Sequence, residues 1–136
     1  MPHVLVVDDD TAIRQMLRLV LEDEGYAVRE AMDGIEALAA LRVSARPLVV
    51  LLDLMMPRLG GDGVLAAVTA KSNLATRHAY ILMTASAGWP EACGAMLARL
   101  DAAMVLKPFD LDELVGLVAQ AARRLARGLA LATAAS

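Results

Sequence analysis

The chain has 136 residues, of which 58% are hydrophobic and 3% aromatic, and its formal net charge at pH 7 is −3. This length predicts one domain with its own core, and the charge gives no electrostatic reason to expect direct binding of nucleic acid or a membrane surface. No apolar run approaches the roughly 20 residues of a membrane span. One cysteine, Cys93, excludes an internal disulfide, and with no leader peptide evident we expect a cytoplasmic protein.

The first half of the chain alternates apolar runs with segments of helical periodicity. Residues 4–7 show no polar alternation, which predicts a buried strand of a parallel sheet. From Thr11, apolar residues recur every three or four positions, which predicts a helix that ends at Gly25. We then expect a weaker strand at 27–31, a helix at 35–41 and the strongest strand at 48–52.

The second half repeats this alternation. We expect, in order, a helix at 64–70, a strand at 80–83, a helix at 91–100, a strand at 102–106 and a last helix from 111. Asp110 caps the last helix, whose apolar face includes Leu114, Val118 and Leu125. We assign residues 1–127 to the domain and interpret residues 128–136 as a frayed or disordered tail.

The order of elements is strand then helix, five times over. It predicts an α/β fold with a doubly wound five-stranded parallel sheet and five helices on its two faces. Ligands bind such sheets at the carboxyl ends of the strands. Four predicted strands end in polar side chains there, namely Asp8 and Asp9, Asp53, Thr84, and Lys107.

The chemistry of these five side chains points to phosphoryl transfer. Three carboxylates in one crevice repel one another unless a cation joins them. Mg²⁺ suits such a site, because it binds one or two carboxylates, keeps waters and bridges to phosphate oxygens. Lys107 adds a second positive charge and Thr84 a hydroxyl donor, so the set favours transfer of a phosphoryl group to Asp53.

Four segments resemble motifs of the response-regulator receiver family: VLVVDDD, LLDLMMPRLGG, ILMTAS and VLKPF. They occur in the order that the family has, and the resemblance covers roughly residues 3–125. It implies a flavodoxin-like sheet with strand order 2-1-3-4-5, similar to the chemotaxis regulators, and a phosphoprotein of a two-component phosphorelay. A sensor histidine kinase or a phosphotransfer protein would supply the phosphoryl group to an otherwise unidentified output pathway.

The resemblance also implies roles for single residues. Asp53 resembles the phosphoacceptor, and Asp8 and Asp9 resemble the acidic pair that holds Mg²⁺, with Asp9 a direct ligand and Asp8 acting partly through water. Asp10 lies one position beyond this pair and is not expected to be a ligand. The remaining matches are Met55, whose backbone carbonyl would bind the metal, Thr84, the switch hydroxyl, Lys107, the phosphate-pairing lysine, and Pro108, which often follows a cis peptide bond in the family.

One position departs from the family pattern. Met104 stands where the family has a tyrosine or phenylalanine that changes rotamer as the switch hydroxyl moves. We therefore expect the switch to involve Thr84 and Met104, and the output to pass through the surface of the helix at 91–100, the strand at 102–106 and the last helix. Trp89 stays open as a partner contact or as packing over the helix at 91–100, and a homodimer through the last helix also stays open.

Two alternatives remain. A pseudo-receiver that binds partners without taking phosphate would keep the fold, and Met104 is the residue that leaves this open. A haloacid-dehalogenase-like phosphatase needs Asp-x-Asp followed by Thr two residues later, but Ala12 occupies that position. We expect no enzyme activity beyond the protein's own phosphorylation and dephosphorylation.

Overall fold

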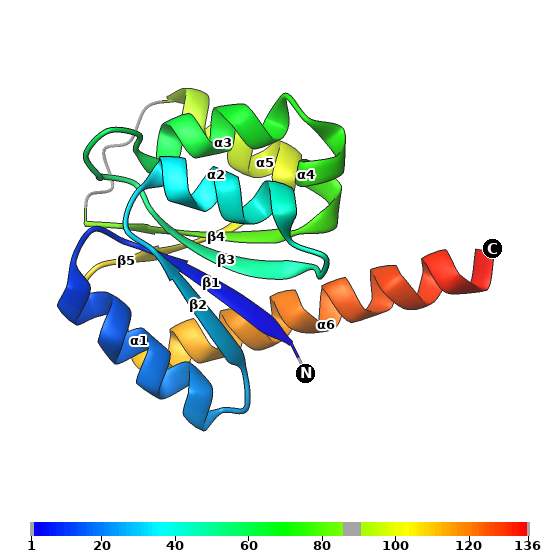
Figure 1. Cartoon of the computed structure of the whole chain (residues 1–136), viewed down its shortest axis with the longest axis horizontal. Coiled ribbons are helices and arrows are strands. Elements are labelled where there is room, and N and C mark those ends of the chain that lie inside the picture. Colours follow the sequence, from blue (N-terminus) through cyan, green and yellow to red (C-terminus); the bar gives the residue numbers. More distant parts are fainter. Residues whose placement is uncertain (1, 86–90, 136) are drawn as a thin grey trace.

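The structure, a computed structural model, describes residues 2–85 and 91–135. Its five strands form one parallel sheet in the order β2-β1-β3-β4-β5 (Figure 1). The strands are β1 (His3–Val7), β2 (Ala27–Ala31), β3 (Leu48–Asp53), β4 (Ala79–Thr84) and β5 (Ala103–Leu106). The predicted doubly wound sheet and its strand order are confirmed.

Helices cover both faces of the sheet. One face packs against α1 (Thr11–Asp23) and α6 (Leu111–Ala135), and the other against α2 (Gly34–Val43), α3 (Gly61–Thr69), α4 (Ser72–Arg77) and α5 (Glu91–Leu100) (Figure 1). The central strands therefore carry apolar side chains in both directions. In β1, Val4 and Val6 enter the core beneath α1 and α6, while Leu5 and Val7 enter the other core. This double burial explains the lack of polar alternation in these strands.

The number of helices differs from the prediction. Six helices are present in the described ranges where we expected five, because α4 forms in the connection between α3 and β4. It has six residues, and its N-cap, Lys71, makes no side-chain capping bond. Its one buried side chain is Leu74, whose carbonyl accepts a hydrogen bond of 2.8 Å from the Tyr80 hydroxyl. A helix of six residues with one buried side chain shows little periodicity in the sequence.

Local capping explains where α1 and α2 begin. The side chain of Asp10 accepts hydrogen bonds from the backbone of Ala12 and Ile13, and that of Asp33 accepts one from Glu36. At the other end of the chain, α6 continues to Ala135, past the domain boundary that we set at residue 127. In Figure 1 this continuation projects beyond the sheet. Among the described residues, no helix combines the length and apolar character needed to cross a membrane.

Candidate functional site

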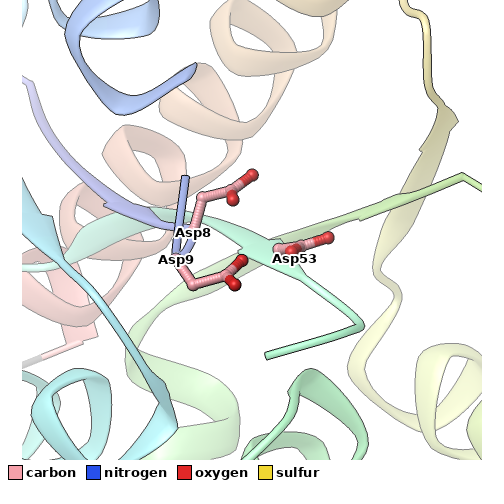
Figure 2. Close-up of side chains that lie close together, drawn as sticks. All are labelled: Asp8, Asp9 and Asp53. Atoms are coloured by element: carbon pink, nitrogen blue, oxygen red, sulfur yellow. The ribbon is translucent and has the colours of Figure 1, made fainter. Parts of the chain in front are cut away.

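Three aspartates gather at the carboxyl edge of the sheet. Asp8 and Asp9 follow β1 and Asp53 ends β3, and one oxygen from each lies within 4.8 Å of the others (Figure 2). Asp8 and Asp53 are 1% and 5% exposed, whereas Asp9 is exposed to solvent. The adjacent strands β1 and β3 run in parallel register, so their ends bring residues 45 positions apart into one cluster.

Lys107 places its ammonium group against two of these aspartates. Its Nζ atom lies 2.8 Å from Asp8 Oδ2 and 3.2 Å from Asp53 Oδ1. The lysine follows β5, and its backbone N–H donates a 2.7 Å hydrogen bond to the carbonyl of Thr84 at the end of β4. The peptide bond between Lys107 and Pro108 is cis.

The buried charges alter one another's proton affinity. Burial raises the pKa of Asp53 and the charge of Asp8 raises it further, while the Lys107 ammonium opposes both. Burial would lower the pKa of Lys107, but its hydrogen bond to Asp8 and the charge of Asp53 outweigh burial and raise it. Two of the three clustered carboxylates therefore contact the one ammonium, and a hard cation with oxygen ligands fits the remaining negative charge.

The loop after β1 is held from α1. The Asp10 backbone N–H donates to Asp8 Oδ1 at 2.9 Å, and Arg14 Nη1 donates to the Asp8 carbonyl at 2.6 Å. Glu30 pairs with Arg14 at 3.0 Å and so helps orient the guanidinium. This role of Arg14 has no signal in the sequence, because a charged residue on a helix usually faces solvent. Since the Asp10 carboxylate caps α1, it does not form the Asp-x-Asp pair that the phosphatase alternative needs.

The other predicted residues lie around this cluster. Thr84 is buried, and Met104, in β5, is partly buried against the core on the α5 side of the sheet. Met55 follows Asp53 by two residues and its side chain is 75% exposed. Trp89 lies outside the described residues. The proposed roles of all site residues remain predictions.

Gly61 keeps the loop after Asp53 close to α3. A Cβ atom at Gly61 would lie 2.5 Å from the carbonyl oxygen of Asp53 and 2.9 Å from Leu54 Cα, and both neighbours are backbone atoms. We expect Gly61→Ala to lower the free energy of unfolding by about 1–3 kcal/mol, as overpacking does, and to displace Asp53. Urea denaturation measures this, with Gly116→Ala as control, because nothing lies within 4 Å of a Cβ there. Equal stability of the two variants would contradict the prediction.

Comparison with known proteins identifies the family. Residues 4–119 match the model of the response regulator receiver domain. The chain belongs to this family. It is 36% identical over 122 residues to the DNA-binding response regulator MtrA of Mycolicibacterium paratuberculosis. The aligned region covers 90% of this chain and 52% of MtrA. The chain spans about half the length of the curated relatives it matches.

Solved structures agree with this assignment. The receiver domain of the Francisella response regulator 1452 has a TM-score of 0.78 and 32% identity, over 91% of this chain and 98% of that domain. The Thermotoga maritima response regulator TrrA, solved in complex with Mg(2+)-BeF, has a TM-score of 0.74 and 31% identity, over 88% and 98% of the two chains. This chain is thus a receiver domain of a two-component response regulator.

Proposed function

We propose that this receiver accepts a phosphoryl group on Asp53 in a Mg²⁺-dependent reaction. The observation that carries the proposal is the contact of Lys107 Nζ with Asp53 Oδ1 at 3.2 Å, beside the carboxylates of Asp8 and Asp9. A carboxylate oxygen of Asp53 attacks the phosphorus of a phosphohistidine, the new O–P bond forms, and the P–N bond to the donor imidazole breaks. The ammonium of Lys107 can move from Asp53 to the incoming phosphoryl oxygens and offset their charge.

Four groups of this chain would hold the metal. They are the carboxylates of Asp9 and Asp53, the Asp8 carboxylate acting partly through water, and the backbone carbonyl of Met55. Oxygen donors of this kind suit Mg²⁺, and the relative TrrA was solved with Mg(2+)-BeF. Bound Mg²⁺ supplies neutralisation of the charge that develops on the phosphoryl oxygens.

The donor and the readout follow from the family. We infer that a sensor histidine kinase or a phosphotransfer protein supplies the phosphoryl group, and that Thr84 and Met104 couple it to the surface formed by α5, β5 and α6. This chain has a net charge of −3 and is not itself proposed to bind nucleic acid, although relatives about twice its length are named DNA-binding. We also infer a cytoplasmic location, since Cys93 is a free, buried thiol, which suits a reducing compartment.

Phosphorylation by a small donor tests this proposal. With acetyl phosphate and Mg²⁺, we expect the intact mass to increase by one phosphoryl group, and Asp53→Asn to abolish the increase. Asp10→Asn is the matched control, because asparagine also caps a helix and Asp10 is not among the clustered carboxylates. If a cognate kinase also leaves the wild-type protein unmodified, with rapid hydrolysis excluded by quenched-flow sampling, the pseudo-receiver reading replaces the proposal.

A further inference from the structure

The loop that connects Asp53 to α3 is closed on itself. The Gly61 N–H donates a 2.9 Å hydrogen bond to the carbonyl of Leu54, so residues 54–61 form a short loop whose two ends are hydrogen-bonded to each other. The exposed Met55 lies within this loop, directly after Leu54. The position of the Met55 carbonyl therefore depends on how the remainder of this loop is held.

Arg58 occupies the most strained position of the loop. Its φ is 67°, a conformation that non-glycine residues rarely adopt, and the N–H of Leu59 donates to the carbonyl of Pro57 across it at 2.8 Å. A three-residue hydrogen-bonded turn with positive φ at its centre is the rare, strained form of the γ-turn. Such strain persists only where the surrounding structure holds it in place.

Contacts with the beginning of α2 hold this turn in place. The Arg58 guanidinium forms an ion pair with Asp33, whose side chain is 1% exposed while that of Arg58 is 60% exposed. Asp33 is itself fixed, because it caps α2 by accepting a hydrogen bond from the Glu36 N–H at 2.9 Å. Next to it, the Gly34 N–H donates to the Leu59 carbonyl at 2.9 Å. Asp33 and Gly34, the N-cap and the first residue of α2, thus bind two adjacent residues of the loop.

We propose that Arg58 is a positioning residue for the metal site, which acts through its ion pair with Asp33 to hold the loop that carries the Met55 carbonyl. This inference rests on the proposed function, because it assumes that this carbonyl binds Mg²⁺. Partners of this kind, which orient a ligand without touching the metal, commonly change metal affinity by a factor of about 10 to 100 when removed.

The sign of the effect separates positioning from charge. Removing a cationic side chain near an acidic site strengthens the binding of a second cation, by Coulomb's law. A positioning role predicts the opposite, because the loop loses its hold and the carbonyl is no longer fixed. Glycine adopts positive φ readily, so Arg58→Gly relieves the backbone strain at this position. Weaker Mg²⁺ binding by this variant would therefore not come from added strain.

The experiment is a calorimetric titration of the full chain with MgCl₂. We expect Arg58→Gly to weaken Mg²⁺ binding about 10-fold. Urea denaturation without Mg²⁺ checks that the variant is still cooperatively folded, because the buried Asp33 loses its ion-pair partner. Asp33→Asn, which keeps a capping side chain, should weaken binding similarly, and Arg58→Lys should restore part of the affinity. Arg42→Ala removes an exposed arginine near the end of α2 and serves as the charge-matched control.

The outcomes are distinct. If the wild-type protein binds no Mg²⁺, the proposed function fails and this inference fails with it. If the wild type binds Mg²⁺ and Arg58→Gly binds it equally or more tightly, only the inference is overturned, whatever the result for Asp33→Asn, because removing a carboxylate weakens cation binding by charge alone. Weaker binding by both variants, with partial recovery in Arg58→Lys and no loss in Arg42→Ala, supports it.

Discussion

Replacing Lys107 with methionine is expected to lower the free energy of unfolding by about 3 kcal/mol in Mg²⁺-free buffer at neutral pH. The ammonium contacts Asp8 at 2.8 Å and Asp53 at 3.2 Å, and the side chains of these aspartates are 1% and 7% exposed. Removing one partner of a buried ionic group leaves the others uncompensated, which costs more than the pair itself contributes. Without the ammonium, the carboxylates of Asp8, Asp9 and Asp53 would also repel one another.

Urea denaturation measures this loss, and the chain offers a matched control. Lys71 is the only other lysine in the sequence and is exposed, so Lys71→Met should change the free energy of unfolding little. Mg²⁺ should restore part of the stability of Lys107→Met, because it replaces the missing cation. The double variant Lys107→Met/Asp53→Asn should lose less than Lys107→Met alone. A loss no larger than that of Lys71→Met would mean that the contact carries little free energy.

The part of the site that the sequence predicted is the part that topology brings together. These side chains are far apart in the chain, but Asp53 ends a strand and Asp8 and Lys107 directly follow one, and parallel strands end at one edge of the sheet. Recognising the strands in the sequence was therefore enough to predict that these side chains lie close together. The strand pattern was strong because both faces of the sheet are buried, which leaves nearly continuous apolar runs.

The parts that could not be predicted depend on tertiary contacts. Arg58 shows no sequence signal, because positive φ is normally indicated by glycine and here it occurs at an arginine. Its partner Asp33 lies in an Asp-Gly pair, which is typical of a turn, and this pattern contains no information about a residue 25 positions away. For the same reason, the hydrogen bond from Arg14 to the Asp8 carbonyl became evident only in the structure.

The end of α6 illustrates a different limit. Residues 128–136 were assigned to a C-terminal tail, either a frayed helix end or a disordered terminus, because their sequence is of low complexity. The structure continues α6 to Ala135, and the fraying of this end stays a prediction. Alanine and leucine have the highest helix propensities, so a helix already formed by packing can continue through them without further contacts. Leu114 and Val118, both fully buried, provide that packing at the beginning of α6.

Acidification from pH 6.5 to pH 4 is expected to remove about 3 kcal/mol of stability through His78 alone. Burial lowers the pKa of this histidine from 6.5 to about 4, the charge of Arg77 adds to the lowering, and the Leu41 backbone carbonyl opposes it. His78 Nδ1 accepts a 3.0 Å hydrogen bond from the Leu48 N–H, which requires the neutral ring. Within the described part of the chain, Nε2 is buried without a hydrogen-bond partner.

The direction follows from proton binding. Between pH 4 and 6.5 the unfolded chain binds a proton at His78 and the native protein does not, so protons favour unfolding in this window. The stabilising effect is complete above pH 6.5 and is lost as the pH falls through about 4. Free energies of unfolding from urea titrations at several pH values measure it. Carboxylates also titrate near the lower end of this range, so the result is the difference between wild type and variant.

His78→Gln is the decisive variant, because its amide oxygen can accept the hydrogen bond from Leu48 but does not titrate. We expect its stability to fall less steeply than that of the wild type between pH 6.5 and 4. His3→Gln is the matched control, since His3 is the only other histidine and is less deeply buried. If both variants retain the wild-type slope, the ring of His78 can be protonated in the native state at little cost, and the acid sensitivity of the fold has another source.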